Sequence, residues 1–174
     1  MVIGYLWYIN TFEVAFVDNN LIFLVLIALS VFNIFNFRIK AKCFSGDVGS
    51  ISIAFVIVFL LGLLIFKSKD ISWIILLGLY GVDAILTIIH RIMLKENILK
   101  PHRKHMYQIR TNELKIPHLV VSGGYCVVQA LIVVGFIVTE FRYLYAVGVI
   151  AFFSVVYVLF MRRFFRLQKT PCGI

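Results

Sequence analysis

Five long apolar segments, separated by short polar stretches, organise this chain. They cover residues 21–37, 51–66, 71–89, 119–139 and 143–161. A helix needs about 20 consecutive apolar residues to cross a bilayer, and flanking residues can extend the two shorter segments. A further apolar stretch over 1–9 precedes them and is typical of the last part of a membrane helix. The pattern therefore predicts five full spans after an N-terminal partial helix.

The spans are expected to be helices, because backbone polar groups in lipid must be satisfied within the segment. A closed barrel would need strands of alternating polarity, whereas these segments are continuously apolar. Composition agrees, with 62% hydrophobic residues, 14% charged residues and a mean hydropathy of +1.01. We therefore predict an all-α polytopic transmembrane helix bundle, with 1–174 as a single transmembrane domain in contact with the lipid bilayer.

The basic residues predict how the spans are oriented. Segments 38–50, 90–118 and 162–174 carry three, seven and four Lys or Arg residues. The remaining three are Lys67, Lys69 and Arg142. By the positive-inside rule, the two rich loops and the tail are cytoplasmic. We expect a multi-pass protein of the cell inner (plasma) membrane. The net charge of +9 is explained by this topology, so no nucleic-acid partner is expected.

The loop before the second span carries the densest polar signal, the string FSGDVGS. Gly46 and Gly49 let the backbone approach a bulky anion, and Ser50 is a good N-cap for the next helix, whose start favours phosphate. Asp47 could hold Mg²⁺, and Lys42 adds positive charge nearby. The same residues are also compatible with an ordinary turn and cap next to a membrane span.

FSGDVGS resembles the F-x-G-D-x-G-S loop of the polyprenyl-phosphate sugar-1-phosphate transferase family. That family includes the UDP-GlcNAc:undecaprenyl-phosphate GlcNAc-1-phosphate transferases and the phospho-N-acetylmuramoyl-pentapeptide transferase. The resemblance implies that Asp47 is a catalytic residue associated with Mg²⁺, with Mn²⁺ as an alternative. It also implies two substrates, a UDP-sugar and polyprenyl (undecaprenyl) phosphate. The wider string over 35–55 is most similar to the GlcNAc-1-phosphate branch.

Asp83 interrupts an otherwise apolar span, and an intramembrane carboxylate is a functional candidate because its burial is costly. Helical spacing places it on one face with other polar residues: Tyr80, Thr87 and the pair His90 and Arg91. This face could line a catalytic cleft. Alternatively, Asp83 pairs with Arg91 or with a neighbouring helix and holds the bundle together. A weaker polar face on the fourth span is expected to join helices: Ser122, Tyr125 and Gln129.

The loop over 95–118 contains a second cluster, formed by His102, Arg103 and His105. Arg is a bidentate phosphate binder and His a donor or proton carrier, so these residues could contact a diphosphate. A zinc site at His102 and His105 lacks further ligands, and a solvated basic loop is the plain alternative. A short surface helix is also predicted here, with a loose apolar face: Met106, Ile109, Leu114 and Ile116.

This loop is similar to the family's P-x-R-x-H-x-H-H segment, which helps to bind the UDP-sugar. Pro101, Arg103 and His105 match it, whereas Tyr107 and Gln108 stand where the family has histidines. These two departures bear on which contacts the loop makes with the nucleotide and on which sugar it prefers. The resemblance implies that the cationic side chains of the loop bind the UDP-sugar: His102, Arg103 and His105.

The resemblance covers about 32–118 and corresponds to the C-terminal half of the family's longer chains. The family's paired aspartates and its Asn-Phe-x-Asp-Gly loop precede this region and are not found here. We therefore expect transfer of GlcNAc-1-phosphate in cell-envelope polysaccharide synthesis, with this chain inactive alone and dependent on a missing N-terminal half or a homodimer partner. A non-catalytic pseudoenzyme or scaffold is the main alternative, and a transporter subunit is a further one.

Overall fold

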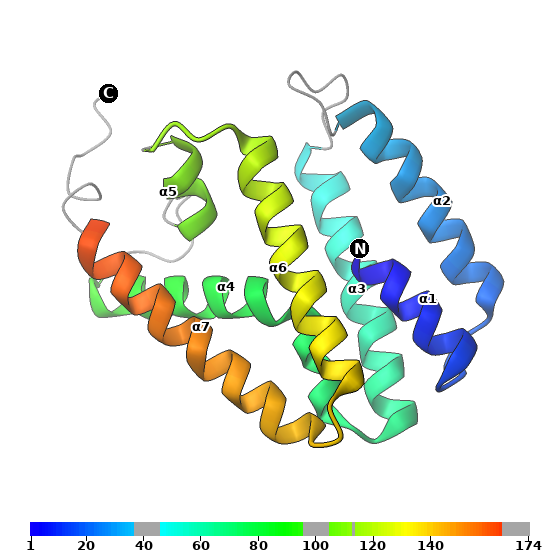
Figure 1. The fold of residues 1–174 in the computed structure, drawn as a ribbon. Helices are drawn as coiled ribbons and strands as arrows, with labels where there is room; N and C mark the ends of the chain where they lie inside the picture. The colour runs from blue at the N-terminus through cyan, green and yellow to red at the C-terminus, as the bar shows by residue number, and fades with distance from the viewer. Residues whose placement is uncertain (37–45, 96–104, 113, 165–174) are drawn as a thin grey trace. The chain divides into compact units, whose positions relative to one another are not determined.

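The computed structural model describes residues 1–36, 46–95, 105–112 and 114–164, except for the side chains at 46, 47, 112 and 164. Every regular element in these ranges is a helix (Figure 1). The helices are α1 (Val2–Phe12), α2 (Asn19–Asn36), α3 (Gly46–Ser68), the 3₁₀ helix η1 (Ile71–Leu77), α4 (Gly78–Met93), α5 (Met106–Asn112), α6 (His118–Val138) and α7 (Arg142–Phe164). The predicted all-α fold is confirmed.

The five predicted spans are also confirmed. Helices long and apolar enough to cross a membrane cover Asn19–Asn36, Val48–Ser68, Ile71–Met93, His118–Val138 and Arg142–Arg163. Large apolar side chains on them, such as Phe55, Leu131 and Leu144, are exposed, as expected for helices that face lipid. The protein is therefore a multi-pass membrane protein. The N-terminal partial helix is α1, which at about 1.5 Å per residue is too short to cross a bilayer.

The third span is built from two kinds of helix. It begins as the 3₁₀ helix η1 and continues as α4 from Gly78, with Leu77 (φ −110°, ψ 11°) at the change. Gln129, a fully buried side chain of α6, accepts a hydrogen bond from the Leu79 backbone N–H at 3.1 Å. Because the first N–H groups of a helix have no intrahelical partner, Gln129 satisfies one of them. The predicted role of Gln129 in joining helices is confirmed.

The structure divides into two compact units, Met1–Leu76 and Leu77–Ile174, called here the N-terminal and C-terminal units. In the N-terminal unit, α1 packs against both α2 and α3. Its core consists of apolar side chains from α1, α2, α3 and η1: Ile3, Leu6, Ile9, Ile22, Leu60, Leu61, Leu64, Trp73, Ile75 and Leu76.

The turn between α1 and α2 is ordered by one buried side chain, that of Asn10. Its Oδ1 accepts from the backbone N–H groups of Phe16 and Val17, at 2.8 and 3.0 Å. Its Nδ2 donates to Val17 O at 2.9 Å and to Asn19 Oδ1 at 2.7 Å. The Asn10 side chain therefore supplies hydrogen-bond partners for backbone groups of the turn that no helix satisfies.

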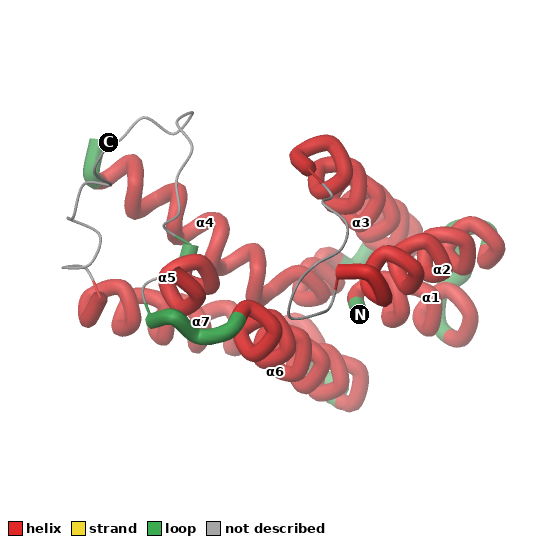
Figure 2. Tube along the Cα trace, turned by 90° about the horizontal axis from the view of Figure 1, so that it is seen from above, coloured by secondary structure: helices red, strands yellow, loops and turns green. Residues whose placement is uncertain are grey.

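In the C-terminal unit, α4 packs against α6 and α7, and α5 packs against the same two helices. Figure 2 shows these helices from above. The core contains buried side chains from all four helices: Leu79, Met106, Ile109, Val121, Tyr125, Tyr157 and Met161. The short helix predicted in the 95–118 loop is confirmed as α5. Of its predicted apolar face, Met106 and Ile109 are buried, whereas Leu114 is exposed.

Candidate functional site

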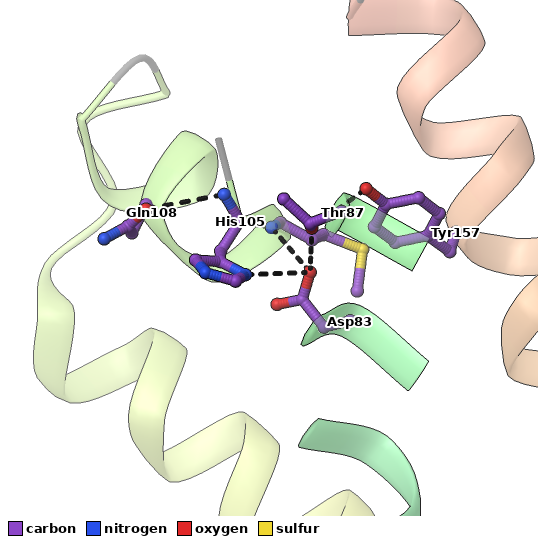
Figure 3. A network of polar contacts seen from close by, with 6 residues as sticks. Asp83, Thr87, His105, Gln108 and Tyr157 are labelled. Atoms are coloured by element: carbon purple, nitrogen blue, oxygen red, sulfur yellow. Dashed lines mark hydrogen bonds and ion pairs between the residues drawn. The ribbon is translucent and has the colours of Figure 1, made fainter. Parts of the chain in front are cut away.

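Asp83 lies at the centre of a buried polar network in the C-terminal unit (Figure 3). The residue, on α4, is 3% exposed. Its Oδ1 accepts a hydrogen bond from the Met106 backbone N–H at 3.0 Å and one from the Thr87 hydroxyl at 3.3 Å. The same oxygen lies 3.9 Å from His105 Nδ1. Asp83 thus fastens the start of α5 to a membrane-spanning helix.

The network extends to α7 through a second hydroxyl. Thr87 Oγ1 and Tyr157 Oη lie 3.0 Å apart and share a buried hydrogen bond. Hydrogen bonds of this kind join helices in membranes, where an unpaired polar group is costly. Asp83, Thr87 and Tyr157 therefore connect α4, α5 and α7 in one set of contacts.

His105 occupies the edge of this network, at the residue before α5. Its side chain is 22% exposed, and its ring stacks on that of Tyr107 with centroids 5.7 Å apart. Its backbone N–H donates to Gln108 Oε1 at 3.4 Å. Two predicted site residues, Asp83 and His105, are therefore brought together. The sequence does not predict this distance, because Asp83 and His105 are far apart along the chain.

The other polar residues predicted on this face of α4 lie in three different surroundings. Thr87 and Arg91 are buried like Asp83, so these three residues share one face, as predicted. Tyr80 is about half exposed and lines a pocket between α4, α5 and α6. His90 is half-buried and lines a different pocket, of about 490 Å³, between α4 and α7.

The pocket between α4, α5 and α6 has a volume of about 660 Å³. We call it the tyrosine pocket. Aromatic and polar side chains dominate its lining: Tyr80, Tyr107, Gln108, Thr111, His118, Val121, Ser122 and Tyr125. The Tyr80 and Tyr125 rings contact each other with centroids 5.5 Å apart. Sequence motifs do not reveal this pocket, because three helices contribute to it.

Tyr107 is the lining residue that connects the pocket to the polar network. Burial raises the pKa of its phenol, and the negative charge of Asp83 raises it further, against a smaller lowering by a hydrogen bond with Gln108. The phenol is therefore protonated at neutral pH and can donate a hydrogen bond.

The GDVGS part of the motif, from Gly46, forms the beginning of α3. The prediction of Ser50 as the N-cap is wrong, because the helix already begins at Gly46 and Ser50 lies inside it. An aspartate at position 47 then stands in the first turn, where the helix dipole favours negative charge. Gly49 is half-buried and Ser50 is exposed, while the Asp47 side chain is outside the described part of the structure.

Three further predicted residues, Lys42, His102 and Arg103, lie outside the described residues. Asp47 belongs to the N-terminal unit and His105 to the C-terminal unit. Within the described ranges, no group of three or more His, Cys, Asp or Glu side chains is placed to hold a metal ion. Magnesium commonly uses one or two carboxylates together with substrate phosphates, so a single aspartate remains compatible with the predicted ion.

Comparison with known proteins finds no matching family model, no matching curated protein and no matching solved structure.

Proposed function

We propose that this membrane protein takes part in the transfer of a sugar-1-phosphate, with GlcNAc-1-phosphate as the expected group, from a UDP-sugar to polyprenyl phosphate. The observation that supports the proposal is the position of the GDVGS part of the motif, from Gly46, at the start of a membrane-spanning helix. There the free N–H groups and the dipole of α3 favour an anion. Asp47 is proposed to hold Mg²⁺ or Mn²⁺ next to the phosphates.

The contact between Asp83 and His105 supports the same proposal. The resemblance of the His105 loop to a UDP-sugar-binding segment gives this histidine a role, and the 3.9 Å approach of Asp83 gives it a fixed position. An imidazole placed at the edge of the membrane can donate a hydrogen bond to phosphate or carry a proton. In the proposal Asp83 therefore positions His105, while Arg103 and His102 add contacts to the diphosphate.

The proposed orientation puts both motif loops and the C-terminus in the cytoplasm, at the inner (plasma) membrane. Its support is the excess of Lys and Arg in these segments. A reporter that fluoresces only in the cytoplasm, fused after Ile174, should be active. The same reporter inserted at Glu140, in the turn between α6 and α7, should be dark. The reverse pattern would overturn the orientation.

Binding of labelled UDP-N-acetylglucosamine to the purified chain in lipid nanodiscs tests the function. We expect Mg²⁺ to strengthen binding, and Asp47→Asn to weaken the Mg²⁺-dependent binding about tenfold or more, because it removes the charged ligand of the ion. Glu140→Gln is the matched control, since Glu140 is an exposed carboxylate in the turn between α6 and α7. Failure of the nucleotide sugar to bind, or wild-type binding by Asp47→Asn, would overturn the proposal.

Transfer is measured in parallel, as label that appears in undecaprenyl-linked product. We expect transfer only when a polypeptide supplying the family's paired aspartates is co-expressed, because phosphoryl transfer requires several groups around the metal and the phosphates. Turnover by this chain alone would contradict that expectation. Binding without transfer under both conditions would favour the alternative of a non-catalytic pseudoenzyme or scaffold.

A further inference from the structure

The lining of the tyrosine pocket has a distinct chemistry. Three phenols, one carboxamide, two aliphatic hydroxyls and one imidazole surround it, and no carboxylate, lysine or arginine is among the lining residues. Such groups offer hydrogen bonds to hydroxyl or amide groups and flat surfaces to a ring, without the charge that would select a phosphate. The lining therefore fits a neutral ring that carries several hydroxyl groups.

Tyr125 gives a second, independent indication of a ligand. The residue is 4% exposed, and its hydroxyl has no hydrogen-bond partner among the described residues. Buried phenols normally find a partner, and leaving one unpaired costs free energy. Its ring contacts the Tyr80 ring, and the Arg110 guanidinium carbon lies 5.9 Å from its centroid. Tyr125 thus brings to the pocket lining a hydroxyl that has no partner among the described residues.

Tyr107 and Gln108, the two residues that depart from the family's histidine pattern, both line this pocket. The Tyr107 ring also stacks on His105, which links the pocket to the proposed diphosphate contact. A ligand in the pocket would therefore lie next to His105. The departures replace groups that can carry positive charge with neutral hydrogen-bonding groups.

We propose that the tyrosine pocket binds one neutral sugar ring, which stacks on the tyrosines and hydrogen-bonds to Tyr125, Tyr107 and Gln108. The inference rests on the proposed function in one respect only, namely that the sugar ring belongs to a UDP-sugar. Tyr107 and Gln108 then determine which sugar is accepted.

Saturation-transfer NMR on the whole chain in nanodiscs tests the pocket. The probes are UDP-N-acetylglucosamine, UDP and methyl N-acetylglucosaminide. We expect transfer to the sugar ring protons and a higher affinity for UDP-N-acetylglucosamine than for UDP. Tyr125→Phe should weaken binding of the sugar-bearing probes about 2- to 10-fold, the loss of one neutral hydrogen bond, and leave UDP binding unchanged. Tyr143→Phe, at an exposed tyrosine of α7, is the matched control.

Thermal unfolding separates this role from a structural one. Because the Tyr125 hydroxyl has no described partner, Tyr125→Phe should retain or slightly raise the melting temperature. A lowered melting temperature with unchanged sugar affinity would overturn the proposal.

The failures of the two proposals are distinguishable. If UDP binds but the sugar adds no affinity, the pocket proposal fails and the proposed function stands. If no nucleotide binds but the methyl glycoside does, and Tyr125→Phe weakens it, the proposed function fails and the pocket proposal stands. If saturation is transferred from the protein to lipid protons but not to sugar protons, a lipid is the occupant and the pocket proposal is overturned.

Discussion

The Asp83 carboxylate accepts the backbone N–H of Met106 at 3.0 Å, inside the protein. A carboxylate buried in a membrane span thereby holds the first residue of a helix from the following loop. This bond gives Asp83 a structural role, which is compatible with its proposed role in positioning His105.

Replacing Asp83 should release the start of α5. Asp83→Ala leaves the buried Met106 N–H unpaired, which costs about 1–3 kcal/mol. We expect the Met106 amide to exchange hydrogen at least tenfold faster, whereas Asp83→Asn retains an acceptor and should show a smaller effect. Hydrogen exchange followed by mass spectrometry measures this, with Glu140→Ala as control. Unchanged protection of Met106 in Asp83→Ala would show that the bond does not hold α5.

The shared hydrogen bond of Thr87 and Tyr157 should appear as a coupling energy. Thr87→Val and Tyr157→Phe should each destabilise the protein by about 0.5–1.5 kcal/mol, because each leaves the other hydroxyl without this partner. The double variant should lose less than the sum, with coupling of about 0.6 kcal/mol, as is typical between membrane helices. Unfolding in mixed micelles provides the measurement. Strict additivity would argue against the bond, and Tyr143→Phe should be neutral.

Asn10 should control the turn between α1 and α2. Asn10→Ala removes the acceptor of two backbone N–H groups and should destabilise the N-terminal unit by about 2 kcal/mol. Faster hydrogen exchange at Phe16 and Val17 is the expected readout. Asn20→Ala, an exposed neighbour, serves as control. Equal exchange in both variants would show that the turn is ordered by other contacts.

Gly135 should be the glycine of α6 that tolerates alanine least. A Cβ there would overlap the Tyr145 hydroxyl, which donates to Ile132 O at 3.2 Å. The clash should outweigh the helix-propensity gain of up to about 1 kcal/mol, so that Gly135→Ala lowers the unfolding free energy. At Gly124 no atom lies within 4 Å of the added Cβ, so Gly124→Ala should be neutral or stabilising.

Combining Gly135→Ala with Tyr145→Phe removes the nearest clashing atom and should restore part of the loss. The measurement is the melting temperature, in one detergent, of Gly135→Ala, Tyr145→Phe, their combination and the control Gly124→Ala. A stabilised Gly135→Ala would show that the Tyr145 ring moves aside at little cost.

Sequence pattern predicted the elements well, because a bilayer imposes a length and an apolarity that can be counted along the chain. The five spans, the partial helix α1 and the short helix α5 were all predictable in this way. The helix start at Gly46 was not, since the first turn of a helix can contain both glycine and aspartate. The helix therefore begins four residues before Ser50, which lies inside α3.

The sequence by itself determined that this is an all-helical membrane protein, and it supplied the motif residues Asp47, Asp83 and His105. The tertiary structure decided which of these meet. It placed Asp83 against Met106 and His105, paired Thr87 with Tyr157, and assembled the tyrosine pocket from three helices. The physical reason is that polarity along a helix is fixed by local sequence, whereas the partner of a buried polar group depends on how separate helices pack.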